Sequence, residues 1–298
     1  MIARKDRALA RPARGEGGWM NGRNGEGGNG PEDLEDEFEE FDDEDLQAVL
    51  RLIAERAGQV IMAHYAEGAA IEVRAKDDAS PVTAADEAAE ACILQALETL
   101  TPEIPVVAEE AMAAGTQADI SGGLFWLVDP LDGTKEFLAR NGEFTVNIAL
   151  IQDGEPVAGV VHAPAMAMTW AGAGAGSATY SEADRPPQGI ETRQAPEDGL
   201  VVVASRRHGT TKELDRFLAD YHVAEQMEAG SSLKFCLIAS GKADLYPRFG
   251  RTMEWDTAAG HAVLLAAGGS VTRADDGSPL RYAKPGFENP HFIARGRP

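Results

Sequence analysis

Apolar residues recur at helical spacing in two long stretches of the first third of the chain. In residues 46–66 ("LQAVLRLIAERAGQVIMAHYA") every third or fourth residue is apolar and the charges fall on the other side. This pattern predicts an amphipathic helix. A second helix is predicted in 80–100, with Thr83 at its N-cap and Asp86 in its first turn.

Short apolar runs bounded by acidic or turn residues predict strands. The runs 104–110 ("IPVVAEE") and 124–130 ("LFWLVDP") both end in or beside carboxylates. Residues 144–164 contain two further strands joined around Asp153 and Gly154, a dipeptide typical of hairpin turns. A Gly-rich and Pro-containing stretch over 172–198 then interrupts the pattern.

The remainder of the chain alternates between strand and helix patterns. The predicted elements are strands at 200–205, 223–228, 243–249 and 290–295, helices at 211–221 and 231–241, and a helix of small residues in 254–269 that Asp256 opens. We therefore predict a disordered tail over 1–43, an α+β subdomain over 44–195 and an α/β subdomain over 196–298.

Charge is concentrated near the N-terminus. The formal net charge is −22, and residues 32–45 contain eleven acids and no base, after a Gly- and Arg-rich start without apolar periodicity. Such a segment cannot bury enough apolar surface to fold. The Arg-rich start lacks the apolar core of a secretory signal, and no apolar run reaches the length of a membrane span. We expect a cytoplasmic protein.

The two cysteines, Cys92 and Cys236, both fall within apolar helical patterns. This placement predicts two buried free thiols and no disulfide framework. The charge balance stays negative without the tail, and no stripe of basic and aromatic residues is present, so nucleic acid is not an expected partner.

Carboxylates gather at the ends of the predicted elements. Strand ends and helix starts are the places where an α/β layer exposes polar groups. Convergent carboxylates repel one another unless cations neutralise them, and oxygen ligands without His or Cys suit Mg²⁺. Such sites typically perform phosphate chemistry. The acids in question are Asp86, Glu109, Glu110, Asp129, Asp132 and Asp256.

These motifs resemble the lithium-sensitive, Mg²⁺-dependent phosphatase superfamily of inositol monophosphatase and fructose-1,6-bisphosphatase. The resemblance is carried by Asp86, the pair Glu109–Glu110, "DPLDGT" from 129, "WD" at 255–256 and "GG" at 268–269. The strings "SPVTAAD", "WLVDPLDGTKEF", "GSSLKFC" and "WDTAAGHAV" are most similar to the 3′(2′),5′-bisphosphate nucleotidases of the CysQ type. The resemblance covers about residues 46–298 and implies a layered α-β-α-β-α sandwich of mixed α+β and α/β character.

The resemblance also implies a metal site for two or three Mg²⁺ ions in the first subdomain. Glu109, Asp129 and the carbonyl of Leu131 would hold one ion, and Asp129, Asp132 and Asp256 a second. Two ions sharing a carboxylate suit an in-line phosphoryl displacement. Thr134, supported by Glu109 or Asp86, would deprotonate the attacking water.

Substrate binding falls mainly to the second subdomain by the same resemblance. Gly133 and Thr134 would present amides to the reacting phosphate, and Ser231, Lys234 and Arg248 would hold the phosphate that is not cleaved. His208 would lie against the adenine, with Tyr246 lining the same pocket. The implied reaction is hydrolysis of adenosine 3′,5′-bisphosphate to AMP and phosphate, with activity on 3′-phosphoadenylyl sulfate and a role in clearing a by-product of sulfur assimilation.

Two other functions stay open on the sequence alone. The first is an inositol-phosphate or sugar-phosphate phosphatase that uses the same metals. The second is an inactive, nucleotide-binding regulatory protein. The presence of every acidic residue of the implied metal site argues against this second function. The resemblance leaves open monomer or homodimer, and peripheral association with the inner membrane.

Overall fold

The computed structural model describes residues 42–66, 73–75, 81–205 and 212–297, together with two short strands at 10–11 and 39–40. Most of the tail predicted over 1–43, and the segment that contains His208, lie outside the described residues. The two short strands, β1 (Ala10–Arg11) and β2 (Glu39–Glu40), pair only with each other.

A seven-stranded sheet forms the centre of the first half of the chain. All neighbours are antiparallel except β5 and β6, which run parallel. The predicted hairpin between β7 and β8 is confirmed, and its turn residues Asp153 and Gly154 both have positive φ. In spatial order the strands are β11 (Gln188–Gly189), β10 (Thr179–Glu182), β9 (Met168–Ala173), β8 (Glu155–Ala163), β7 (Thr145–Gln152), β6 (Leu124–Asp132) and β5 (Val106–Ala108).

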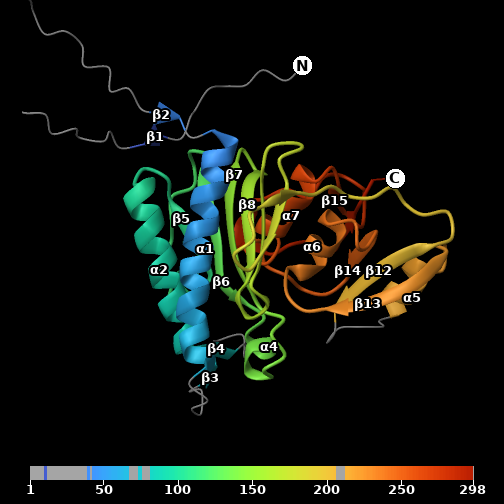
Figure 1. The fold of residues 1–298 in the computed structure, drawn as a ribbon, viewed down its shortest axis with the longest axis horizontal. Coiled ribbons are helices and arrows are strands. Elements are labelled where there is room, and N and C mark those ends of the chain that lie inside the picture. Colours follow the sequence, from blue (N-terminus) through green and yellow to red (C-terminus); the bar gives the residue numbers. More distant parts are fainter. Residues whose placement is uncertain are drawn as a thin grey trace, which may run out of the picture.

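Helices α1 (Asp43–Ala66) and α2 (Ala84–Leu100) cover the outer face of this sheet (Figure 1). Helix α1 begins at Asp43, because the carboxylate of Asp42 accepts hydrogen bonds from the amides of Glu44 and Asp45. Helix α2 begins after Thr83, as predicted, and Thr83 and Asp86 form a capping box. The apolar sides of both helices pack against β6, β7 and β8.

Helices α6 (Leu233–Ala239) and α7 (Ala258–Ala266) form a middle layer on the opposite face of the same sheet. Helix α7 approaches the sheet closely, because two sheet positions carry no side chain. A Cβ on Gly172 would lie 2.5 Å from the Cβ of Ala266, and one on Gly159 would lie 2.9 Å from the Cβ of Ala262. Both distances are shorter than van der Waals contact, so the small residues set the spacing of these layers.

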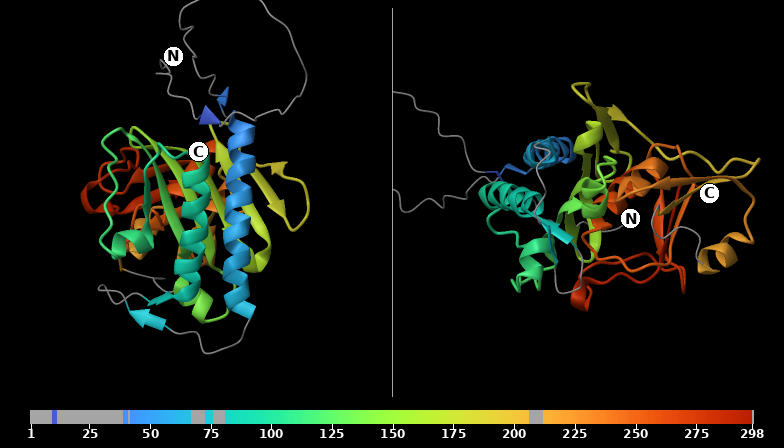
Figure 2. Two further views of the ribbon diagram at one scale, coloured as in Figure 1. Left: turned by 90° about the vertical axis from the view of Figure 1, so that its left-hand side faces the viewer. Right: turned by 90° about the horizontal axis from the view of Figure 1, so that it is seen from below.

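A five-stranded sheet and an outer helix complete the layers, as Figures 1 and 2 show. The helix is α5 (Lys212–Leu218), which packs on the far face of the sheet with Leu214 and Leu218 buried. The predicted α-β-α-β-α sandwich is thus confirmed. In spatial order the strands are β13 (Val223–Ala229), β12 (Leu200–Ser205), β14 (Leu245–Arg248), β16 (Phe292–Arg295) and β15 (Ser270–Arg273).

Several elements were not predicted from the sequence. Strands β9 to β11 lie partly in the stretch 172–198, where the sequence predicts an interruption, and β15 follows α7. A small separate sheet pairs β3 (Val73–Ala75) with β4 (Pro81–Thr83). The short helical turns are α3 (Glu109–Ala113), α4 (Thr134–Leu138), η1 (Pro164–Met166) and η2 (Pro285–Phe287).

One buried apolar cluster joins the two sheets through the middle layer. It contains Phe125 of the first sheet, Phe235 and Val263 of the middle helices and Val203 of the second sheet. The division into two subdomains at 195/196 stays a prediction. The two predicted subdomains would share this apolar core. Cys92 and Cys236 are both free, as predicted, but only Cys236 is buried; the prediction of a buried thiol was wrong for Cys92, which is partly exposed on helix α2. Among the described residues, no helix combines the length and apolarity needed to cross a membrane.

Candidate active site

The end of strand β6 carries Asp129 and Asp132. Asp129 pairs with Asn147 of β7, and Asp132 pairs with Thr145. The register therefore shifts here, because an advance of three residues along β6 corresponds to two residues along β7. This irregularity, at Pro130 and Leu131, turns the strand end out of the regular ladder. Asp129 is 1% exposed and accepts a hydrogen bond from the amide of Leu131 at 3.1 Å.

Gly133 turns the chain from β6 into α4 with a φ of 91°, a conformation that glycine adopts without strain. Thr134 follows as the first residue of α4. Its hydroxyl donates to Oδ1 of Asp86 at 3.2 Å, while Oδ2 of Asp86 accepts from the amide and hydroxyl of Thr83. The structure therefore brings the predicted pair Asp86 and Thr134 together.

Glu109 and Glu110 begin the short helix α3, which differs from the predicted strand over 104–110. The strand β5 ends at Ala108 because the amides of Glu110 and Ala111 donate to the carboxylate of Glu90, both at 2.8 Å. Ala108 itself offers no capping side chain. Glu90, which is buried in helix α2, thus sets the start of α3 and with it the position of Glu109.

Asp256 lies in the turn before α7, not at its first position, and its carboxylate accepts from the amide of Met253 at 2.8 Å. Two buried neighbours hold this turn. Glu254 accepts from the amides of Ala283 and Lys284, and pairs with the Lys284 ammonium at 2.6 Å. Asn289 donates to the carbonyl of Met253 and the hydroxyl of Thr257.

The carboxylates of Asp132 and Asp256 repel each other inside the protein. Burial, together with the charges of Glu109 and Glu136 and against the opposing charge of Lys234, raises the pKa of Asp132 to about 6. Burial also raises the pKa of Asp256 well above its ordinary value, followed by the charges of Asp132 and Glu109. Uncompensated like charges in one place favour binding of a cation.

The donor set fits a hard divalent ion. Its side chains supply only carboxylate and hydroxyl oxygens, with the carbonyl of Leu131 close to the Thr134 hydroxyl, and hard cations prefer such ligands. Within the part of the chain that the structure describes, no three His, Cys, Asp or Glu side chains lie close enough together to hold a metal ion.

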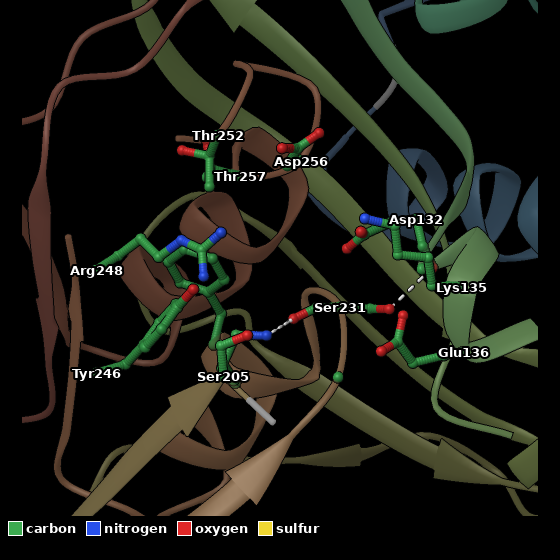
Figure 3. Close-up of a pocket in the computed structure, with 14 residues that line it drawn as sticks. Asp132, Lys135, Glu136, Ser205, Ser231, Tyr246, Arg248, Thr252, Asp256 and Thr257 are labelled. Carbon is green, nitrogen blue, oxygen red and sulfur yellow. Dashed lines mark hydrogen bonds between the residues drawn. The ribbon is translucent and has the colours of Figure 1, made fainter. Parts of the chain in front are cut away.

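A cavity of about 160 Å³ adjoins these acids (Figure 3). Asp132 and Asp256 line one part of it, and Lys234, Tyr246 and Arg248 line another. The remaining lining residues are Gly133, Lys135, Glu136, Ser205, Gly230, Ser231, Phe235, Thr252 and Thr257. The cavity is smaller than a typical ligand pocket of about 300–1,000 Å³, and its size suits a phosphate group.

Lys234 is buried under the basic part of the cavity. Its ammonium donates to the carbonyls of Ala229 and Ser231 and lies 5.3 Å from the centre of the Tyr246 ring. Burial lowers the pKa of Lys234 to about 8, while the charge of Asp132 opposes the shift. Lys234 therefore also supports the loop that precedes α6.

Ser231 joins the two halves of the site. Its φ is 49°, and its hydroxyl lies within hydrogen-bonding distance of the carbonyls of Asp132 and Glu143, at 2.9 and 2.8 Å. A Cβ on Gly133 would come within 2.2 Å of this hydroxyl, so the loops touch only because residue 133 is glycine. The phosphate-binding role of Ser231 stays a prediction.

Arg248 directs its guanidinium toward the cavity (Figure 3). One terminal nitrogen donates to the carbonyl of Arg251 at 3.1 Å, but the buried Nε has no hydrogen-bond partner among the described residues. Leaving a buried donor unsatisfied is costly. The side chain lines the cavity, where a guanidinium suits an anionic ligand.

The structure groups most of the predicted site residues, and it also identifies supporting residues that we did not predict. His208 lies outside the described residues. The sequence offered a signal for Glu90, which falls four residues after Asp86 on the buried face of α2. The supporting residues are Glu90, Glu136, Asn147, Thr252, Glu254, Thr257 and Asn289.

Comparison with known proteins assigns the chain to a family. The sequence profile described as the Inositol monophosphatase family matches residues 42–294. The chain belongs to this family. Inositol monophosphatase family enzymes are metal-dependent phosphatases, which agrees with the acidic side of the cavity.

Two relatives with similar sequences are both named 3′(2′),5′-bisphosphate nucleotidase CysQ. The 3′(2′),5′-bisphosphate nucleotidase CysQ of Escherichia coli K12 is 48% identical over 241 residues, which is 80% of this chain and 95% of that protein. The protein of the same name from Buchnera aphidicola is 41% identical over 248 residues, covering 81% of this chain and 90% of that protein.

A solved structure agrees with this placement. The crystal structure of CysQ from Bacteroides thetaiotaomicron, described as a bacterial member of the inositol monophosphatase family, superimposes with a TM-score of 0.72 at 37% identity. The match covers 85% of this chain and 97% of that one. An inositol monophosphatase from Anabaena gives a TM-score of 0.67 at 26% identity, over 85% and 91% of the two chains.

Proposed function

We propose that this chain is a Mg²⁺-dependent 3′(2′),5′-bisphosphate nucleotidase that hydrolyses adenosine 3′,5′-bisphosphate to AMP and phosphate, and also accepts 3′-phosphoadenylyl sulfate. The observation that carries the proposal is the basic pair Lys234 and Arg248 lining the same cavity as Asp132 and Asp256. The names of the similar CysQ relatives agree with it.

The charges on the two sides of the cavity favour a substrate with two phosphates. The acidic side, with Asp132 and Asp256, attracts a phosphate only when cations are bound. The basic side, with Lys234 and Arg248, attracts a phosphate directly, since guanidinium and ammonium groups form charge-assisted hydrogen bonds with it. A monophosphate would leave one side of the cavity without a partner.

The residues around Thr134 would handle the proton of the attacking water. Because the Thr134 hydroxyl donates to Asp86, its own oxygen is free to accept a proton from the water while Asp86 takes up the hydroxyl proton. Asp86 is one of the two supporting acids that the sequence left open, and this hydrogen bond supports it in that role. The carboxylate of Asp86 is held in place by Thr83.

Glu109, Asp129, the Leu131 carbonyl, Asp132 and Asp256 would hold the Mg²⁺ ions. Two or three bound ions supply Lewis acidity and a more acidic water. Activity should vanish in excess chelator and return with Mg²⁺, whereas Ca²⁺, which prefers looser and higher coordination, should not restore it. Full turnover in chelator would contradict the metal assignment.

The substrate is tested by comparing kcat/KM on adenosine 3′,5′-bisphosphate and on inositol 1-phosphate. We expect a clear preference for the nucleotide, and Arg248→Ala should lower kcat/KM for the nucleotide about 10- to 150-fold while affecting inositol 1-phosphate far less. Arg251→Ala is the matched control, because that arginine pairs with Glu288 at the surface. Equal losses on both substrates would favour a sugar-phosphate phosphatase instead.

A further inference from the structure

One peptide group connects the carboxylate of Asp256 with the segment 282–289, which lies between β15 and β16. The amide of Met253 donates to Oδ2 of Asp256 at 2.8 Å. The carbonyl of the same peptide group, that of Thr252, accepts a hydrogen bond from the amide of Asn289 at 2.9 Å. Hydrogen bonds in such a chain strengthen one another. The group that orients the Asp256 carboxylate is therefore itself held by Asn289.

The side chain of Asn289 holds the next peptide group of the same turn. Its amide nitrogen donates to the carbonyl of Met253 at 2.7 Å and to the hydroxyl of Thr257 at 3.0 Å. Asn289 is buried. The main chain and the side chain of this one residue thus fix both peptide groups that flank Met253.

Glu254 ties the other end of the segment to the turn. Its carboxylate is 0% exposed, accepts from the amides of Ala283 and Lys284 at 2.8 and 2.9 Å, and lies 2.6 Å from the Lys284 ammonium. The amide of Glu254 donates to the carbonyl of Phe287 at 2.8 Å. A buried carboxylate is costly unless hydrogen bonds and an opposite charge compensate it. Filling space alone would not require a charged group at this position.

The backbone of the segment is held in a strained conformation. Ala283 and Phe287 have φ values of 67° and 56°, and such strain persists only where the surrounding contacts over-determine the conformation. Asp256 lines the same cavity as Asp132, and two carboxylates in one cavity repel each other unless a cation is bound. A rigid support for Asp256 opposes this repulsion and keeps the carboxylate in place for the ion.

We propose that Glu254 and Asn289 are positioning residues for Asp256, and that they raise Mg²⁺ affinity by holding the segment 282–289 against the turn 252–257. Neither side chain lines the cavity, so their effect reaches the ion through Asp256. The inference rests on the proposed function in taking Asp256 as a metal ligand. Residues that orient metal ligands in this way contribute to affinity without touching the ion.

The test is titration of the metal-free protein with Mg²⁺ by calorimetry, without nucleotide. Glu254→Gln and Asn289→Ala should each weaken, about 10-fold, the Mg²⁺ binding that Asp256→Asn abolishes. Added to Asp256→Asn, neither should weaken the remaining Mg²⁺ binding further, because both act through Asp256. Glu288→Gln is the matched control, since this exposed residue of the same segment pairs with Arg251 at the surface and should change Mg²⁺ affinity less than about 2-fold.

Unchanged Mg²⁺ affinity with a lowered melting temperature in Glu254→Gln and Asn289→Ala would show a purely structural role and overturn the inference. An equal loss in Glu288→Gln, or a further loss on top of Asp256→Asn, would also overturn it. If Glu254→Gln does not fold, Asn289→Ala carries the test from the other end of the segment.

The same titrations separate this inference from the proposed function. No nucleotide is present, so a failure of the substrate assignment leaves the result intact. If Asp256→Asn binds Mg²⁺ as the wild type does, the metal assignment fails and this inference fails with it. If Asp256→Asn loses Mg²⁺ binding while Glu254→Gln and Asn289→Ala keep it, this inference alone is refuted.

Discussion

At the scale of single residues, Asp132 shows that catalysis and stability oppose each other in this protein. Its carboxylate is proposed to hold a metal, yet burial and neighbouring acids raise its pKa to about 6. The unfolded chain has the ordinary lower value, so the native state binds more protons between about pH 4 and pH 6. The free energy of unfolding of the metal-free protein therefore loses a contribution as the pH rises through this window.

Asp132→Asn should abolish the activity. It should also remove the fall in the free energy of unfolding that accompanies the rise in pH. In chelator, the variant should match the wild type near pH 4 and exceed its free energy of unfolding by about 2–3 kcal/mol at pH 7, at about 1.4 kcal/mol per pKa unit. Denaturant unfolding across this pH range measures the difference. Burial lowers the pKa of His162 to about 4 and of His261 to about 3, but these groups are common to both proteins and cancel. A difference that does not change with pH would contradict the assignment.

At the scale of elements, helix α3 depends on a residue from another helix. The carboxylate of Glu90 in α2 accepts two amides of α3 and thereby positions Glu109 at its first residue. Because Ala108 cannot cap the helix, the start of α3 is set by tertiary contact and not by its own sequence.

Glu90→Gln should impair both stability and metal binding. The amide group replaces one of the two acceptor oxygens, so one partly buried N–H loses its partner and the free energy of unfolding should fall by about 1–3 kcal/mol. The Mg²⁺ concentration for half-maximal activity should rise about 10-fold as Glu109 loses its place. Glu98→Gln, on the exposed side of the same helix, is the control. Equal behaviour of the two variants would argue against this role of Glu90.

The same elements show what the sequence could and could not predict. Helix α2 and the hairpin β7–β8 carry their own signals, in Thr83 and in Asp153–Gly154, and both were predicted correctly. Half of strand β9 is glycine or alanine (Ala171, Gly172 and Ala173), and its pairing with β8 and β10 makes it a strand. Within the site, the motif residues could be predicted from the sequence. Asn147 and Glu254 could not, because their hydrogen bonds are made with residues that are distant in the sequence.

At the scale of the whole molecule, one core spans both sheets, and the site lies where they meet. Asp129 and Asp132 come from the first sheet, whereas Lys234 and Asp256 come from segments after residue 200. The folded part extends at its start to Asp42, whose carboxylate caps α1.

Deleting residues 1–40 should therefore leave kcat/KM and the melting temperature nearly unchanged, because the composition of this segment offers little apolar surface. Deleting 1–43 also removes the Asp42 cap and should cost about 1 kcal/mol in the free energy of unfolding. Thermal unfolding of both proteins makes the comparison. A large loss from the shorter deletion would show that the tail docks on the folded part.

The close approach of α7 to Gly159 and Gly172 has a consequence for mutational tolerance. An added methyl group at either position would force backbone or side-chain shifts in the middle of five stacked layers, where overpacking costs about 1–3 kcal/mol. In a library of random variants sorted for folded protein, these two positions should accept almost no replacement. The outer helix α5, which contacts a single sheet, should accept many.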